Sequence, residues 1–250
     1  MSDPSELALR LPSPERLALF LDIDGTLIEA HFGERRRGLD EDRLAVLSRL
    51  HDLLGGALAV ITGRSIETGD MEFGSLVLPM AGIQGADRRY GDGRRVSPVQ
   101  TPDERRSLEE VAEAVSTAYP AVHVYWKVGA MALVHRGEDQ SVFDGLHALV
   151  DSLLAPSLTA IAGRGCIDIG PADANKGVAL KAFMSESPFL GRVPVHIGDD
   201  MPDAPAFAAA RELGGFGIAV DRNVAGVDRY IGTPTDTWTL FDTYLSRWGS

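Results

Sequence analysis

The chain has 250 residues, 44% hydrophobic and 24% charged, which is enough to bury one large core or two smaller ones. Its 24 basic and 36 acidic residues give a formal net charge of −12, which disfavours nucleic acid and anionic membrane surfaces as partners. No segment approaches the roughly 18 consecutive apolar residues that would suggest a membrane-spanning helix.

The start of the chain and its cysteine content bear on its compartment. Residues 1–14 are rich in proline and are expected to form a loose lead-in, without the pattern of a secretory signal. Cys166 is the only cysteine, so no internal disulfide can form, and we expect a buried, unreactive thiol there. These features predict a cytoplasmic protein.

Strands and helices alternate in both outer parts of the chain. Leu17–Asp22 and Leu58–Thr62 are short apolar runs typical of buried parallel strands. Leucines recur at helical spacing between them, in Asp40–Leu54, behind an acidic first turn. The same alternation is predicted later, with helices at 176–185 and 204–213 and strands at 193–197 and 217–220. This order predicts a parallel sheet covered by helices.

The middle of the chain has a different order. Residues 105–119 and 141–154 have the pattern of amphipathic helices, whereas 123–135 and 157–169 are rich in β-forming residues. We therefore predict an α/β core made of residues 1–87 and 166–250, with residues 88–165 as a smaller α+β insertion. Glycines near 85 and at 163–165 could act as hinges or could form tight turns.

Paired carboxylates follow the first predicted strand. Asp22 and Asp24 lie two residues apart and are followed by Gly25 and Thr26. Ligands of open α/β sheets bind at the carboxyl edge of the strands. There, one carboxylate can attack phosphorus and the other can protonate a leaving oxygen. A solvated Asp-Gly turn would account for the same residues taken alone.

Three further groups have the residue types that phosphoryl transfer requires. Thr62 could donate its hydroxyl from a strand end, and Lys176 supplies a cation at a helix start. Asp199, Asp200 and Asp203 place three carboxylates within five residues, whose repulsion a divalent cation would relieve, and Mg²⁺ fits best. Taken singly, these could be an ordinary strand residue, a solvated lysine and a helix start capped by acids.

Together these groups resemble the four motifs of the haloacid dehalogenase (HAD) phosphatases. The resemblance rests on Asp22-x-Asp24-Gly25-Thr26, Thr62-Gly63-Arg64, Lys176 and Gly198-Asp199-Asp200-x-x-Asp203. It implies a HAD-type Rossmann-like core with a cap domain. It also implies that Asp22, Asp24, Thr62 and Lys176 are catalytic. The implied ligands of Mg²⁺ are the side chains of Asp22 and Asp199, the Asp24 carbonyl and, through water, Asp200, while Asp203 orients Lys176.

Nearly the whole chain resembles the trehalose-6-phosphate phosphatase family. The segments that carry this likeness are Ala57–Ser65, Pro79–Arg89, Met131–Arg136 and Asn175–Met184. The resemblance implies hydrolysis of a small sugar phosphate, trehalose 6-phosphate, to trehalose and phosphate through an aspartyl-phosphate on Asp22. It also implies that Gly63, Arg64, Gln84, Lys127 and Asp168 bind this substrate. It also implies a possible separate trehalose-6-phosphate synthase as partner. Oligomeric state is left open.

Several positions depart from that family's pattern. Tyr125 stands where the family has Glu, Asp168 where it has Glu, and Gly170 where it has a basic residue. Gln84 and Asp87 replace the family's His and Glu. A tyrosine cannot substitute in kind for a carboxylate acceptor, so the substrate could be another phosphorylated sugar. A non-catalytic sugar-phosphate binding module is the third alternative.

Overall fold

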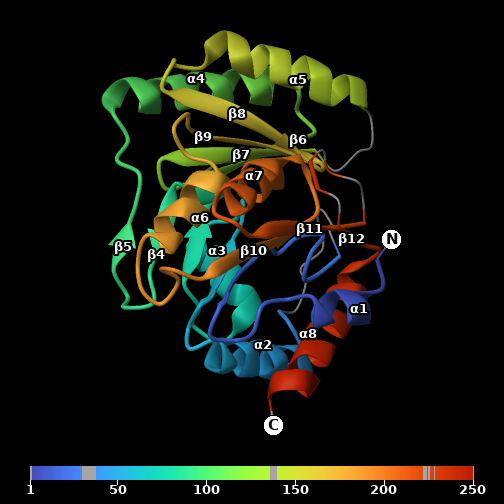
Figure 1. Ribbon diagram of the computed structural model, residues 1–250. Coiled ribbons are helices and arrows are strands. Elements are labelled where there is room, and N and C mark those ends of the chain that lie inside the picture. Colours follow the sequence, from blue (N-terminus) through green and yellow to red (C-terminus); the bar gives the residue numbers. More distant parts are fainter. Residues whose placement is uncertain are drawn as a thin grey trace.

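Two β-sheets organise the chain in the computed structural model, which describes residues 2–29, 38–135, 140–221, 224, 226, 227 and 229–249 (Figure 1). The larger sheet has eight strands in the order β12-β11-β10-β1-β2-β3-β4-β5. In chain order they span β1 Leu17–Leu21, β2 Leu58–Ile61, β3 Met80–Gly82, β4 Asp87–Arg89, β5 Arg95–Val96, β10 Val193–Gly198, β11 Phe216–Val220 and β12 Tyr230–Ile231.

The centre of the larger sheet is parallel and fully buried. Every residue of β1 and β2 is buried, as their uninterrupted apolar sequences predict. Strand β1 pairs in parallel with β10 on one side and with β2 on the other, so that Leu19 lies opposite Val195 and Leu58. The carboxyl ends of these three strands therefore meet at one edge of the sheet. Strands β4 and β5 add an antiparallel extension at the far end.

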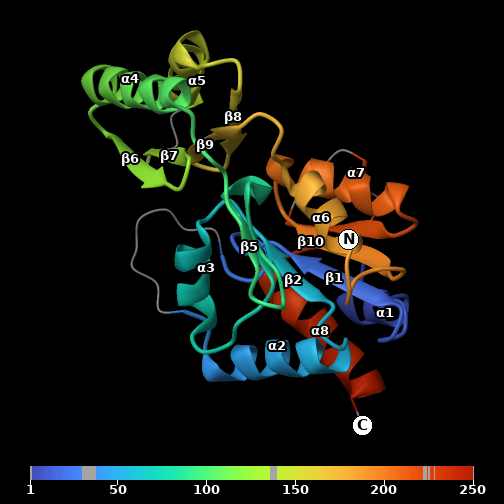
Figure 2. The ribbon, with the colours of Figure 1, turned by 90° about the vertical axis from the view of Figure 1, so that its left-hand side faces the viewer.

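Helices cover both faces of the larger sheet. Figure 2 shows α6 and α7 on one side and α1, α2 and α8 on the other. The helices of this part span α1 Pro4–Leu9, α2 Glu41–Leu53, α3 Ile66–Phe73, α6 Lys176–Met184, α7 Ala204–Glu212 and α8 Pro234–Trp248, with short 3₁₀ turns at Ile83–Gly85 and Met201–Asp203. Among the described residues, no helix combines the length and the apolar character needed to cross a bilayer.

The smaller sheet has four antiparallel strands in the order β6-β7-β9-β8. They span β6 Val122–Lys127, β7 Ala130–His135, β8 Leu158–Gly163 and β9 Cys166–Pro171, and they pack against α4 Pro102–Ala118 and α5 Gln140–Leu153. Alternate strand residues and the inner faces of both helices form a separate apolar core. The sheet lies between these helices and the larger sheet (Figure 1).

The pairing of the strands changes the predicted limits of the insertion. Residues 88–165 were expected, but β4 and β5 pair within the larger sheet, and β9 at 166–171 pairs within the smaller one. We therefore propose residues 102–171 as the insertion, called the cap below, and the remainder as the core. The connections between them run through 97–101 and 172–175. Gly163 ends β8 and Gly165 lies in the turn to β9, so these glycines serve a tight turn within the cap and not a hinge between cap and core. Arg136, in one of the segments that resemble the family, lies outside the described residues.

The proline-rich start of the chain is not a loose lead-in, contrary to the sequence expectation. Pro4–Leu9 form α1, whose first turn is capped by the Asp3 side chain. Leu7, Ala8 and Leu11 are buried in the main core, where α1 packs against α8. Tyr244 donates a hydrogen bond to the Pro12 carbonyl at 2.8 Å. The short apolar pattern of α1 was too brief to distinguish from a loop without its partner helix.

Replacement of Leu7 by alanine should destabilise the protein. Leu7 is 2% exposed, and truncation of such a leucine costs about 2–4 kcal/mol through lost burial and the cavity left behind. Leu9, in the same helix, is 57% exposed, so Leu9→Ala is the matched control and should change the unfolding free energy by less than about 0.5 kcal/mol. Urea denaturation measures both. Equal effects of the two substitutions would show that α1 does not dock as described.

Candidate functional site

Three parallel strands bring the predicted catalytic residues together at the carboxyl edge of the larger sheet. Asp22 directly follows β1, Thr62 follows β2 and Asp199 follows β10. The Asp22 amide donates to the Ile197 carbonyl at 2.9 Å, and the Thr62 amide donates to the Ala81 carbonyl at 2.8 Å. Both side chains are therefore held by continuations of the strand ladders.

The Lys176 ammonium group joins two of these elements. Lys176 is the first residue of α6, 2% exposed, and its Nζ lies 2.9 Å from Asp22 Oδ1 and 2.8 Å from Asp203 Oδ1. Burial opposes the charge on Lys176, but Asp203 and Asp22 outweigh this and raise its pKa. The lysine is therefore a buried cation fixed between carboxylates and not a solvated surface residue.

His196, on β10, contacts Asp203 and so helps to hold it beside Lys176. The His196 Nε2 atom lies 2.7 Å from Asp203 Oδ1, and both residues are buried. Burial lowers the pKa of His196, which favours a neutral imidazole that donates to the carboxylate. Burial tends to raise the pKa of Asp203, but Lys176 and the hydrogen bond from His196 bring it down to about 2. Sequence reasoning missed His196, which looks like an ordinary strand residue.

Burial disfavours the charged form of the other two carboxylates of this group, Asp22 and Asp199. Burial raises the pKa of Asp22 well above its ordinary value, although Lys176 opposes the shift. Burial and then Asp203 raise the pKa of Asp199 to about 7. Carboxylate oxygens of Asp22, Asp199 and Asp203 lie within 4.8 Å of one another. A Cβ atom on Gly25 would collide with the Asp199 carboxylate, so glycine is required at this close approach.

The Asp24 carboxylate is turned away from this group and toward Arg64. Arg64 Nε and Nη2 each donate to a different Asp24 oxygen at 2.7 Å, and Arg64 Nη1 donates to Glu72 Oε1 at 2.5 Å. Such a two-pronged pair fixes both partners. Glu72 was not predicted as a site residue from the sequence, because it lies eight residues after Arg64, on α3.

The cap contributes residues that contact the core across the site. Lys127 Nζ donates to the Gly63 carbonyl at 2.7 Å and to Asp168 Oδ1 at 2.5 Å. Gln84, in the core, donates from Nε2 to Asp168 Oδ2 at 2.8 Å. The backbone of Gln84 is left-handed (φ 53°), which aims its side chain at the cap. Cap and core thus share one hydrogen-bonded cluster.

Arg164 was not anticipated from the sequence. It lies in the turn between β8 and β9, where its amide donates to Asp200 Oδ2 at 2.9 Å and its Nη2 lies 2.9 Å from Asp221 Oδ2. The same guanidinium is 4.0 Å from Asp199. A lone arginine between two glycines gives no sequence signal of this kind, because the turn reaches the core only in the folded chain. The cap turn therefore adds a cation beside the acidic loop.

One cavity of about 490 Å³ lies between cap and core, a size typical of small-molecule sites. It contains every site residue predicted from the sequence, namely Asp22, Asp24, Thr62, Gly63, Arg64, Gln84, Lys127, Asp168, Lys176, Asp199, Asp200 and Asp203. Tyr125, Trp126, Arg164 and Cys166 line it as well. Cys166 is half-buried and not fully buried as expected. Burial raises the pKa of its thiol to about 12, which disfavours the thiolate.

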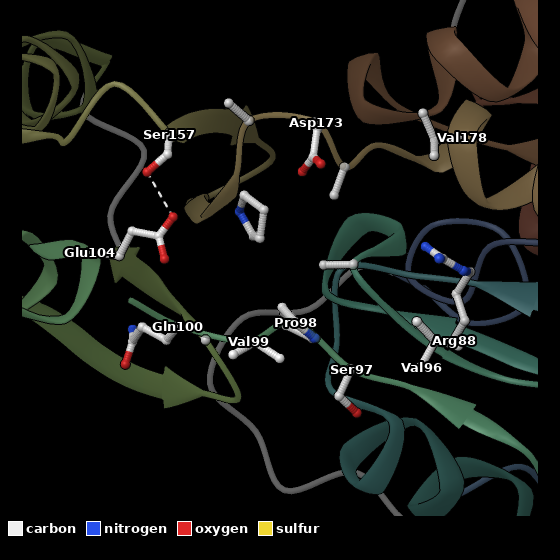
Figure 3. A pocket seen from close by; sticks show the side chains of 15 residues that line it. Arg88, Val96, Ser97, Pro98, Val99, Gln100, Glu104, Ser157, Asp173 and Val178 are labelled. Carbon is white, nitrogen blue, oxygen red and sulfur yellow. Dashed lines mark hydrogen bonds between the residues drawn. The ribbon is translucent and has the colours of Figure 1, made fainter. Parts of the chain in front are cut away.

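A second cavity, of about 580 Å³, lies beside the two connections between core and cap (Figure 3). Its charged lining residues are Arg88, Glu104 and Asp173, and Glu104 is bonded to Ser157 at 2.7 Å. It includes none of the strand-end carboxylates of the first cavity. The first cavity is therefore the candidate site for chemistry.

Comparisons with known proteins agree with this assignment. Residues 20–229 match the family model for trehalose-phosphatase. The chain is 33% identical to the trehalose-6-phosphate phosphatase of Escherichia coli K12 over 91% of this chain and 86% of that protein. It is 28% identical to a bifunctional trehalose-6-phosphate synthase/phosphatase of Thermoproteus tenax, over 78% of this chain and 27% of that protein. The fold resembles the C-terminal domain of the C. albicans trehalose-6-phosphate phosphatase, with a TM-score of 0.81, 16% identity, and coverage of 98% and 96% of the two chains.

The raised pKa of Asp199 predicts how stability depends on pH without metal. Between its ordinary pKa of 3.8 and about 7, folded Asp199 keeps a proton that the unfolded chain releases. Stability should therefore fall as pH rises through this window. Wild type should lose about 4 kcal/mol of unfolding free energy between pH 4 and pH 8 through this group, and Asp199→Asn should lack that loss. Urea denaturation in EDTA measures this, with Asp173→Asn in the exposed connection as control. Equal pH slopes in wild type and Asp199→Asn would contradict the prediction.

Proposed function

Because this chain belongs to the trehalose-phosphatase family, we propose that it hydrolyses trehalose 6-phosphate to trehalose and inorganic phosphate. The observation that carries the proposal is the buried Asp22 carboxylate, held 2.9 Å from Lys176 at the floor of a cavity that Asp24 also lines. A carboxylate in that position can be a nucleophile, and a second one nearby can handle the proton.

The proposed reaction has two steps. Asp22 attacks phosphorus in line, and the bond to the sugar oxygen breaks while Asp24 gives that oxygen a proton. This leaves phosphate covalently attached to Asp22 and free trehalose. Asp24 then takes a proton from a water molecule, which attacks phosphorus and releases inorganic phosphate from Asp22.

Arg64 positions Asp24 for its part in the reaction. Both Asp24 oxygens accept hydrogen bonds from Arg64 in this conformation. Each oxygen keeps a second lone pair that can take up the transferred proton, so Arg64 orients the carboxylate without blocking it. A phosphate in the cavity offers the Arg64 guanidinium a further anionic partner.

Two groups are placed to hold the phosphoryl oxygens. Lys176 supplies a fixed positive charge beside Asp22. The Thr62 hydroxyl accepts a hydrogen bond from the Arg64 amide at 3.2 Å, which leaves its own hydrogen for donation to the substrate. Groups that are already oriented stabilise developing charge without reorganisation.

Mg²⁺ is the metal we propose for the acidic end of the cavity. The donors are carboxylates, which suit a hard cation, and those of Asp22, Asp199 and Asp203 lie within 4.8 Å of one another. Asp203 is already bonded to Lys176 and His196. We therefore assign Asp22 and Asp199 as side-chain ligands, with the Asp24 carbonyl and, through water, Asp200. Bound Mg²⁺ would offset negative charge on the phosphoryl oxygens.

The substrate would be supplied by a trehalose-6-phosphate synthase. The Thermoproteus tenax relative, whose name joins synthase and phosphatase, supports a link between these two activities. A phosphatase for another sugar phosphate is the second candidate, and Tyr125 favours it, because an exposed aromatic ring replaces an expected carboxylate in the cavity.

Asp22→Asn should abolish phosphate release while leaving the fold intact. An amide is a poor nucleophile toward phosphorus, so we expect a loss of at least about 1000-fold in kcat. Phosphate release is measured on trehalose 6-phosphate, glucose 6-phosphate, mannose 6-phosphate, sucrose 6-phosphate and an aryl phosphate. Asp92→Asn, in an exposed turn, is the control. A preference for another sugar would overturn the substrate, and wild-type inactivity on all five would favour a binding role.

Mg²⁺ should raise the melting temperature of the wild-type protein. Binding to the folded state alone stabilises by about 2.7 kcal/mol at a hundredfold excess over Kd, or roughly 5–10 °C here. Asp199→Asn should remove most of this shift, whereas Asp173→Asn should keep it. Differential scanning fluorimetry with and without Mg²⁺ measures the effect independently of turnover. A full shift in Asp199→Asn would exclude Asp199 as a ligand.

A further inference from the structure

Tyr125 presents an aromatic ring to the substrate cavity. We propose that this ring binds the leaving sugar, because it stacks on the C–H face of the sugar ring. The inference rests on the proposed function, because it names how that site recognises its leaving group. A cap carboxylate at position 125 would recognise the hydroxyl groups of the sugar. Tyr125 would instead recognise the shape of the sugar ring.

Strand register places Tyr125 on the face of the cap sheet that looks toward the core. Tyr125 pairs with Ala132 on β7, and Ala132 pairs with Asp168 on β9, so the three form one row across the sheet. The flanking residues Val124, Leu133 and Ile167 belong to the opposite face, which packs into the apolar core under α4 and α5. All three members of the row line the cavity.

The charged groups of this face are already engaged. Lys127 donates to Asp168 Oδ1 and to the Gly63 carbonyl, and Gln84 donates to Asp168 Oδ2. Both Asp168 oxygens therefore have protein partners in the closed arrangement. A sugar hydroxyl that bound Asp168 or Lys127 would have to compete with these contacts. Two of them, from Lys127 to Gly63 and from Gln84 to Asp168, also tie the cap to the core.

What remains on this face is mainly apolar and aromatic. Tyr125 is 48% exposed, while the neighbouring lining residues Ala132 and Val134 have small or branched apolar side chains. Trp126, the next residue on the edge strand, is 55% exposed and also lines the cavity, although strand alternation directs its side chain to the other face of the sheet. The His123 ring is 6.4 Å from the Tyr125 ring and lies outside the cavity lining. Tyr125 is therefore the aromatic ring that this face presents to the cavity.

The chemistry of a pyranose ring fits this surface. Its hydroxyl groups point outward, but its axial C–H bonds give each ring an apolar face. Such a face can cover a tyrosine ring and remove apolar area of both from water, while the phenol hydroxyl stays available for a hydrogen bond. Asp22 and Lys176 anchor the phosphate at the floor, and Tyr125 lies in the cap that roofs the same cavity. The pyranose ring that stacks on Tyr125 would then belong to the leaving sugar.

The test compares three substitutions by two measurements. The first measurement is the ratio of kcat/KM for trehalose 6-phosphate to that for glucose 6-phosphate. The second is saturation-transfer NMR, which follows trehalose binding to the protein without turnover. Tyr125→Phe keeps the ring and loses the hydroxyl, whereas Tyr125→Leu loses the ring. Val128→Ala is the matched control, because Val128 is 46% exposed on the same hairpin and is not among the residues lining the cavity.

We expect Tyr125→Leu to lower the kcat/KM ratio and the affinity for trehalose by about tenfold, the loss of one stacked ring. Tyr125→Phe should stay within about threefold of wild type on both, and Val128→Ala should match wild type. The inference is overturned if Tyr125→Leu binds trehalose as wild type does, if Tyr125→Phe is as impaired as Tyr125→Leu, or if wild type does not bind trehalose. Trehalose binding that depends on Tyr125, without phosphate release, would instead reject the proposed function and keep the stacking.

Discussion

The Lys176 ammonium group, buried between Asp22 and Asp203, is the interaction on which the site depends. Its Nζ lies within 2.9 Å of one oxygen from each. Removing one partner from a buried ion pair typically costs about 3–5 kcal/mol, because the other charge is left uncompensated. Asp203 is held in turn by His196, so a chain of contacts runs from β10 through Asp203 and Lys176 to the end of β1. The charge at Asp22 is thus set by residues from three separate elements.

The parallel sheet makes this chain of contacts possible. Because β10, β1 and β2 lie side by side and run in the same direction, the residues after each strand converge at one edge. The backbone ladder fixes Asp22 and Thr62, and α6 brings its first residue to the same edge. Burial, and after it the neighbouring carboxylates, raise the pKa values of Asp22 and Asp199. A cation bound at this edge would favour the charged forms of both.

The cap turns this edge into a cavity between two parts of the chain. Lys127, Asp168 and Arg164 contact the core at Gly63, Gln84 and Asp200, so the cap is tied to both sides of the acidic group. These contacts engage Lys127 and Asp168 and leave the Tyr125 ring exposed on the cap side of the cavity. Recognition of the leaving group is therefore separated from the phosphate chemistry, with the first in the cap and the second in the core.

The sequence alone determined the parallel core and predicted the α+β insertion and the residues of the acidic site. Buried parallel strands are continuous apolar runs, and Asp22, Thr62 and Asp199 directly follow such runs while Lys176 begins a helix. Their combined spacing, and its resemblance to the HAD motifs, supplied the rest. Only the tertiary structure decided that residues 4–11 dock as a helix and that β9 belongs to the cap. It also decided that Arg64 holds Asp24, that His196 supports Asp203, and that Arg164 reaches the acidic loop. These contacts join residues far apart in the chain or depend on the direction of a side chain. The local sequence pattern predicts neither long-range contacts nor side-chain directions.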